Sequence, residues 1–340
     1  MEFRTYTSPH LPASGSVSRM MSFVLLALLP GSLCAAWLFG WGVLVNILLA
    51  GLAAITAEAV MLMARKRPVL PVLQDGSALL TGVLLALALP PLAPWWIPVI
   101  GSLFAIVIAK QLYGGLGYNP FNPAMAGYVV LLISFPRELS LWPATGKVLG
   151  LQDTLLLVFS GSLPDTLTLD AITMATPLDA VKTRLGLSET LTEIRDSAVF
   201  GSFAGAGWEW LNLWFLLGGL WLLQQKIIKW QIPAGMLGGL FLTALLFYAW
   251  NPDIYPSPLF HLFSGAAMLG AFFIATDPVS ASTTPRGRLY YGFGIGVLTY
   301  VIRTWGGYPD GVAFAVLLMN MAAPTIDYYT RPRVFGHDDS

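Results

Sequence analysis

Long apolar runs are the feature that most constrains this 340-residue chain, because roughly 20 mostly apolar residues can cross a bilayer as one helix. Hydrophobic residues make up 56% of the sequence and charged residues 11%, whereas a soluble domain typically carries about 25% charged residues. We therefore predict an all-α polytopic membrane protein with about ten transmembrane helices. The candidate spans are 21–39, 41–63, 77–93, 95–113, 122–135, 207–227, 232–250, 259–276, 289–303 and 311–328.

The fifth and ninth of these spans are shorter than the others, which is typical of spans that are broken or re-entrant. The lone cysteine, Cys34, lies in an apolar run and has no partner for an intramolecular disulfide. Basic and acidic residues are equal in number, at 18 each, so bulk charge gives no reason to expect a nucleic-acid partner.

The distribution of Lys and Arg predicts the orientation of the spans, because cytoplasmic loops carry an excess of these residues. With the N-terminus in the cytoplasm, twelve of the 18 basic residues fall on the cytoplasmic side. All of the remaining six except Arg303 fall in one long loop, where charge has little influence on topology. Both termini are therefore predicted to be cytoplasmic, and the first span to be an uncleaved anchor.

One long segment divides the chain. Residues 1–135 form a first half with five spans, and residues 207–340 form a second half with five spans and a cytoplasmic tail. The intervening residues 136–206 mix Pro, Ser, Thr and charged residues, and lie outside the cytoplasm on the predicted topology. Loops of this length usually carry function.

An internal repeat relates the two halves. Residues 77–91 align with 264–278, and residues 113–132 align with the shorter stretch 305–318. The copies are five spans apart, an odd number, so they have opposite orientations in the membrane. Such inverted repeats are typical of transporters that bind ligands at interrupted helices. The alternative is chance, since Gly, Pro and Leu recur in any membrane protein.

Gly and Pro interrupt the chain around Asn119 and Asn122. Irregular backbone at membrane depth must be buried in protein or line a cavity. The two amides, three residues apart, are suited to grip one planar polar ring; alternatively, both cap freed backbone groups. Two ionisable residues, Glu58 and Lys110, lie near the predicted cytoplasmic span ends, where we expect their side chains to snorkel toward the interface.

The segment LDAITMATPLDAVKT, residues 169–183, carries the most specific motif of the chain. Its composition predicts a Thr-rich turn followed by a helix that begins near Pro177, since Pro is favoured at the first position of a helix. Thr176 would then be the N-cap residue, and the helix N-terminus could offer its amides to a phosphate.

Residues 170–176 resemble the flavinylation motif of the D subunit of the Rnf complex, the ion-translocating ferredoxin:NAD oxidoreductase, and of the homologous B subunit of the sodium-translocating NADH:quinone reductase. The resemblance implies that Thr176 carries FMN through a phosphoester bond. Asp170 and Ala175 fill further motif positions, and Thr173 could bind the same phosphate. Met174 stands where a smaller or polar residue is commoner.

The resemblance extends over nearly the whole chain, for example through AKQLYGGLGYNPFNPAM and GGYPDGVAFAVLL. It implies a urea-transporter-like 5+5 inverted repeat in the bacterial inner membrane, with the loop that bears Thr176 in the periplasm. It further implies partner subunits, an extracytoplasmic flavin transferase, and a second, non-covalent flavin (riboflavin), for which Asn119 and Asn122 are our candidates. The chain would be an electron carrier without a catalytic site of its own, coupled to Na⁺ or H⁺ movement.

A competing hypothesis is an inverted-repeat solute or ion transporter without redox activity. The internal repeat favours this alternative, and the motif around Thr176 opposes it.

Overall fold

The computed structural model describes residues 15–164, 167–197 and 199–331. Within these ranges the regular structure is helical, and β-pairing is limited to two isolated bridges. Four helical stretches are long and apolar enough to cross a membrane, namely Val17–Phe39, Trp41–Ala64, Gln231–Trp250 and Val312–Thr330. The chain is thus a mostly helical, polytopic membrane protein.

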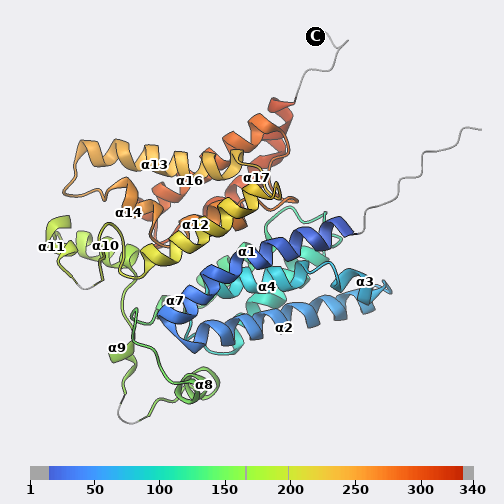
Figure 1. Cartoon of the computed structure of the whole chain (residues 1–340), viewed down its shortest axis with the longest axis horizontal. Coiled ribbons are helices and arrows are strands. Elements are labelled where there is room, and N and C mark those ends of the chain that lie inside the picture. Colours follow the sequence, from blue (N-terminus) through green and yellow to red (C-terminus); the bar gives the residue numbers. More distant parts are fainter. Residues whose placement is uncertain (1–14, 165–166, 198, 332–340) are drawn as a thin grey trace, which may run out of the picture.

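The first half contains two long helices and several short ones (Figure 1). Its elements are α1 (Gly15–Phe39), α2 (Trp41–Ala64), α3 (Val69–Leu73), α4 (Ser77–Ala88), α5 (Trp96–Leu103), the π-helix η1 (Phe104–Gln111) and α6 (Pro123–Ser134). At a rise of 1.5 Å per residue, the twelve residues of α4 extend only about 18 Å, which is well short of a bilayer core.

The second half begins after the long connecting segment. Its elements are α12 (Trp208–Gln224), α13 (Gln231–Trp250), α14 (Pro258–Leu262), α15 (Ala267–Leu269), the π-helix η2 (Gly270–Ile274), α16 (Pro285–Trp305) and α17 (Val312–Thr330). The ninth predicted span is an unbroken helix of 21 residues, α16, so the prediction that it is broken is wrong. The eighth predicted span, 259–276, is broken into α14, α15 and η2, and we refer to it below as the broken eighth span.

The described residues of the connecting segment form five short helices joined by irregular chain. They are α7 (Pro136–Ser140), α8 (Leu151–Ser160), α9 (Leu169–Ile172), α10 (Pro177–Gly186) and α11 (Leu191–Arg195). In Figure 1 these elements gather at one end of the molecule, on the opposite side from the C-terminal end of α17.

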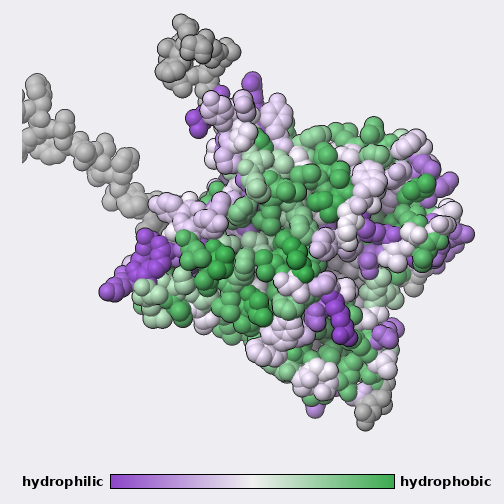
Figure 2. Space-filling view, turned by 180° about the vertical axis from the view of Figure 1, so that it is seen from behind, coloured by the Kyte–Doolittle hydropathy of each residue, from purple (hydrophilic) through white to green (hydrophobic). Residues whose placement is uncertain are grey.

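Small residues allow the closest helix contact, between α13 and α16. A Cβ at Gly292 or Gly296 of α16 would overlap the backbone of α13, and one at Gly239 would overlap that of α16. Such close approach is typical of membrane helix packing. Large apolar side chains, among them Trp37, Leu246 and Trp250, remain exposed on the surface, and Figure 2 shows broad apolar areas on one face. These surfaces suit contact with lipid.

Candidate functional site: two pockets between the halves

The connecting segment is bound to both halves, and residues 170–176, the predicted flavinylation motif, lie where it passes from one half to the other. Upstream, Trp95 N donates to Val158 O at 3.0 Å, which fixes α8 to the first half. Downstream, Leu191 N donates to Asp253 O at 3.1 Å, which fixes α11 to the second half. The motif therefore bridges two separately anchored parts of the segment.

Thr176 is the N-cap of α10, as the sequence predicts. Its Oγ1 accepts a hydrogen bond from Asp179 N at 3.3 Å, and its side chain is half-buried. Pro177 occupies the first turn of the helix and lies against Gly205, where a Cβ would overlap the proline ring. The local sequence thus fixes the position of the Thr176 hydroxyl.

Thr176 lines a cavity of about 290 Å³ between the two halves, which we call the loop-side pocket. Residues from α4, α6, α12, η2 and α17, as well as from the connecting segment, contribute to its wall. Five aromatic side chains line it: Tyr128, Trp142, Trp208, Phe215 and Tyr308. This pocket is close in size to the smallest typical small-molecule sites, about 300 Å³, and it is mainly apolar like them.

The other predicted motif residues lie near Thr176 but do not line this pocket. Thr173 Oγ1 donates to Leu169 O at 3.0 Å, so its hydroxyl is engaged within its own turn. Asp170 and Ala175 are exposed. Thr173 also forms an isolated antiparallel bridge with Pro143, which ties the motif to the preceding chain.

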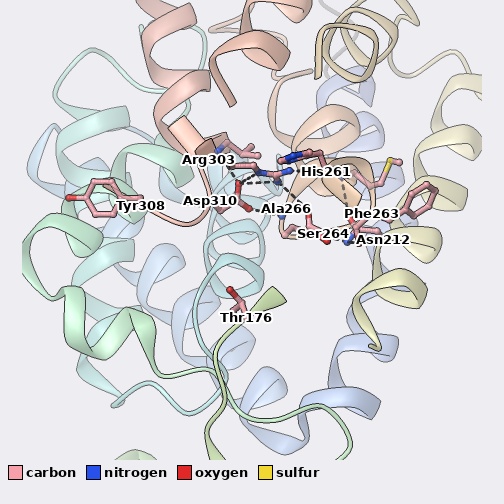
Figure 3. A network of polar contacts seen from close by, with 12 residues as sticks. Thr176, Asn212, His261, Phe263, Ser264, Ala266, Arg303, Tyr308 and Asp310 are labelled. Carbon is pink, nitrogen blue, oxygen red and sulfur yellow. Dashed lines mark hydrogen bonds and ion pairs between the residues drawn. The ribbon is translucent and has the colours of Figure 1, made fainter. Parts of the chain in front are cut away.

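A polar network supports the pocket wall on the side of the second half (Figure 3). Arg303 is 4% exposed and pairs with Asp310 at 3.1 Å, and its guanidinium also donates to His261 O and Ser264 O. Asp310 in turn accepts from Ala266 N at 2.8 Å and from Val312 N at 3.3 Å. The network thereby satisfies backbone groups that the broken eighth span leaves without helical partners.

Asn212 completes this support from α12. Its side-chain nitrogen donates to Trp208 O, Phe263 O and Gly265 O, and its oxygen accepts from Met268 N. Three of the four bonds of this amide therefore hold the broken stretch before η2, and the fourth stays within α12; Asn212 lies on the right in Figure 3. Sequence reasoning missed Asn212 because a single Asn in an apolar run carries no recognisable spacing.

Sequence reasoning also missed Asp179, which lines the loop-side pocket three residues after Thr176. Burial raises the pKa of its carboxyl, while the nearby ammonium of Lys182 and a hydrogen bond from Thr183 oppose the rise. A signal for Asp179 was present, because the third position after an N-cap commonly carries an acidic residue that faces the helix N-terminus.

A second cavity, of about 110 Å³, lies where the predicted amides are, and we call it the amide pocket. Asn119, Asn122, Lys110 and Asp277 contribute to its polar lining. The amide pocket runs along α4 from Ser77 to Leu84, and the loop-side pocket adjoins the end of the same helix at Leu87 and Ala88. The two pockets therefore lie one after the other along α4.

The two amides differ in their contacts. Asn122 caps α6 by accepting from Met125 N at 3.2 Å, and its nitrogen donates to Ile274 O at 3.2 Å, so it makes the contacts of the capping alternative. Asn119 Nδ2 donates to Phe121 O at 3.0 Å. Its Oδ1, however, is buried without a hydrogen-bond partner among the described residues, which leaves one acceptor open to a ligand.

Lys110 and Glu58 do not snorkel, so that prediction is wrong. They are 1% and 0% exposed and form an ion pair of 2.6 Å. Lys110 Nζ also donates to Ser77 Oγ at 2.7 Å, and Gln111 donates to Glu58 Oε1 at 2.7 Å. The ion pair compensates for the contacts with water that Lys110 and Glu58 would otherwise make at the membrane–water interface.

Known proteins match this chain over nearly its full length. A family model described as NQR2, RnfD, RnfE family matches residues 4–336. The D subunit of the ion-translocating oxidoreductase complex of Aliivibrio salmonicida is 57% identical, over 99% of each chain. Proteins of the same name from Vibrio cholerae and Escherichia fergusonii are each 54% identical, over 99% of this chain and 99–100% of theirs. The resemblance seen in the sequence is thereby confirmed, and the chain belongs to the NQR2, RnfD, RnfE family.

Proposed function

We propose that this chain is a membrane subunit of an ion-translocating oxidoreductase complex and that Thr176 carries FMN through a phosphoester bond. The observation that carries the proposal is the position of Thr176: it occupies the acceptor position of the motif, outside the spans, and lines the aromatic loop-side pocket. The relatives' printed name supports the assignment to such a complex.

The loop-side pocket suits a flat aromatic group tethered at Thr176. Its aromatic lining offers ring faces for stacking, and the N-terminus of α10 favours the negative charge of a phosphate. The carboxyl of Asp179 lies in the same wall, and the nearby ammonium of Lys182 partly offsets its negative charge. When bound, the flavin supplies the electron-transfer chemistry, and the protein supplies position and electrostatics.

A second, non-covalent flavin, riboflavin, is our proposal for the amide pocket. The unpartnered Asn119 Oδ1 and the ammonium of Lys110 offer an acceptor and a donor at its wall, which complement the donor and acceptor groups of a polar ring edge. Because this pocket is small, its ligand would need side chains at its rim to move apart. Binding would thus cost some packing of α1 and the residues before α13, which also line the pocket.

The remaining parts of the proposal concern the setting. We place the chain in the bacterial inner membrane, with both termini in the cytoplasm and the loop bearing Thr176 in the periplasm. A flavin transferase on that side would attach the FMN, and electrons would pass to and from the other subunits of the complex. The ion coupled to this transfer would be Na⁺ or H⁺.

Fluorescence of the denatured protein tests the covalent flavin. Wild-type chain coexpressed with its flavin transferase should give a fluorescent band on a denaturing gel, and Thr176→Val should abolish the band completely. Thr168→Val is the matched control, because Thr168 is an exposed threonine that precedes the motif and makes no side-chain cap hydrogen bond, so its band should persist. A dark wild-type band would refute the proposal, and a fluorescent Thr176→Val band would place the attachment elsewhere.

The second candidate function is an inverted-repeat solute or ion transporter without redox activity. One observation favours it: Ser77 and Ser264, which the repeat aligns, are each contacted by a buried basic side chain, Lys110 and Arg303 respectively. Uptake by vesicles with Na⁺ varied at fixed pH discriminates the two. Uptake without an electron donor would favour the transporter, and uptake only with a donor would favour the redox complex.

A further inference from the structure

The ammonium of Lys182 lies among backbone carbonyls at the C-terminal end of α16. Its Nζ is 2.9 Å from Tyr308 O and 3.3 Å from Arg303 O, and it also donates to Gly306 O. The last carbonyls of a helix have no helical partners and carry partial negative charge. A cation at this place therefore binds both the helix end and the turn that follows it.

The turn bound by Lys182 is also part of the loop-side pocket. Gly307, Tyr308, Pro309 and Asp310, which connect α16 to α17, all line this pocket. Lys182 itself lies on α10, the helix whose N-cap is Thr176. One side chain thus joins the helix that presents the Thr176 hydroxyl to the wall that faces it.

The chain before Thr176 is held by different contacts. Met174 N donates to Trp142 O at 2.9 Å, and the ring of Trp142 packs on Phe39 of the first half. Apolar packing also holds α10, because Leu178 and Val181 form a small core with Phe260 of α14. Removal of the Lys182 charge would leave this core in place, so the helix should still form but should open locally more often once its bond to the turn is lost.

We propose that Lys182 is a positioning residue: it holds α10 and the turn after α16 as one unit, so that a group attached to Thr176 stays in the loop-side pocket. This proposal rests on the proposed function, which identifies the group attached to Thr176 as FMN. The attachment itself does not depend on Lys182, because the transferase needs access to Thr176 rather than a fixed pocket wall.

The charge of Lys182 makes this positioning sensitive to pH. Burial lowers the pKa of its ammonium, and the carboxylate of Asp179 on the same helix partly offsets that effect. Across the interface, the charged groups nearest the turn, Arg303 and Asp310, pair with each other. As the pH rises, a lysine with a lowered pKa loses its proton at a pH below the ordinary lysine pKa of about 10.4. The bonds from Lys182 to the turn should therefore weaken at alkaline pH values below about 10.4.

The test compares Lys182→Met with Arg195→Met in the whole complex, coexpressed with the flavin transferase. Arg195 is the matched control because it is an exposed basic residue on α11 of the same connecting segment. In Lys182→Met, hydrogen exchange of the backbone amides in 177–186 should be about tenfold faster than in wild type, since a bond to a charged group is lost. Arg195→Met should exchange at close to the wild-type rate.

The attached flavin gives the second measurement. Its fluorescence anisotropy should fall in Lys182→Met while the fluorescence of the denatured band stays at the wild-type level. In wild type the anisotropy should fall with rising pH, whereas in Lys182→Met it should be low throughout and independent of pH. Equal anisotropy in both proteins, or the same pH profile in both, would overturn the positioning role. If wild type carries no covalent flavin, the proposed function fails, and hydrogen exchange still decides whether Lys182 holds α10.

Discussion

The amide pocket and the loop-side pocket each adjoin a buried basic residue, but the two residues are bound differently. Lys110 pairs with Glu58, and both side chains are almost fully buried. Arg303 is equally buried, yet its partner Asp310 is 25% exposed at the side chain and lines the loop-side pocket. Arg303 also donates to two backbone carbonyls, whereas the second oxygen of Glu58 is without a partner among the described residues.

Lys110 and Arg303 therefore have different structural roles, although both are buried basic residues. In the first half, a buried carboxylate needs its cation, because an unpaired charge in a low-dielectric interior is costly. In the second half, irregular backbone needs donors, because the broken eighth span leaves its carbonyls without helical partners. The first site is therefore an ion pair above all, and the second is a hydrogen-bond support for the pocket wall.

The largest expected effect is the loss of Lys110. Lys110→Met leaves Glu58 buried and unpaired, which should cost about 3–5 kcal/mol of unfolding free energy. Adding Glu58→Gln should recover most of this loss, because the neutral amide still accepts from Gln111. For the other site, Arg303→Met combined with Asp310→Asn should recover little, since the two carbonyls still lack a donor. Thermal unfolding in detergent measures the two single variants, Lys110→Met and Arg303→Met, and the two double variants. Equal recovery in both double variants would refute the distinction.

Gly205→Ala tests how far the loop-side pocket depends on the connecting segment. The added Cβ would overlap the ring of Pro177, so the start of α10 must move, at a cost of about 1–3 kcal/mol. The displacement of Thr176 should also lower the flavin fluorescence of the denatured band. Gly186→Ala, at the other end of the same helix, has no atom within 4 Å of the new Cβ and should leave both stability and fluorescence near wild type.

A smaller effect separates the two amides of the other pocket. Asn122→Ala removes the cap of α6 and should cost about 0.5–2 kcal/mol. Asn119→Ala should cost less stability, because its oxygen has no partner among the residues that the structure describes, while it should weaken binding of added riboflavin. Thermal unfolding and flavin titration of both variants give the comparison. A larger loss of stability in Asn119→Ala would show that its amide serves the fold.

The smallest effect concerns Asp179 and pH. The pKa of this carboxyl is raised by burial, so the folded state holds the proton more firmly than the unfolded state does. The connecting segment should therefore lose stability as the pH rises above the ordinary Asp value of about 3.9. Asp179→Asn should remove this dependence and slow hydrogen exchange in 177–186 slightly at pH 7. Faster exchange in the variant at pH 7 would contradict the prediction that the charged form of Asp179 destabilises the connecting segment.

Much of the fold could be predicted because membrane spans leave a strong signal. Apolar length and composition located the four helices long enough to span a membrane, and the Thr-Pro pair predicted both the cap at Thr176 and the start of α10. The break in the eighth span was missed, because apolar composition continues through α14, α15 and η2 and hides the change in backbone geometry.

The candidate site was predicted only where it is local in sequence. The motif around Thr176 is contiguous, so a resemblance could identify it. The pocket that faces it is assembled from several distant elements, and residues such as Asn212 and Lys182 act through backbone contacts that leave no sequence pattern. The burial of Glu58 and Lys110 was likewise missed, since neither residue alone indicates that the other lies beside it.

The shortness of α4 has an electrical consequence. A bilayer core is about 30 Å thick, yet the amide pocket reaches Leu84 of α4 and the loop-side pocket begins at Leu87 of the same helix. Moving one elementary charge through the full membrane potential is worth about 2.3 kcal/mol per 100 mV. Where the two pockets admit water from each side, that voltage drops over less than the length of α4, about 18 Å, so the local electric field there exceeds the field across unmodified lipid.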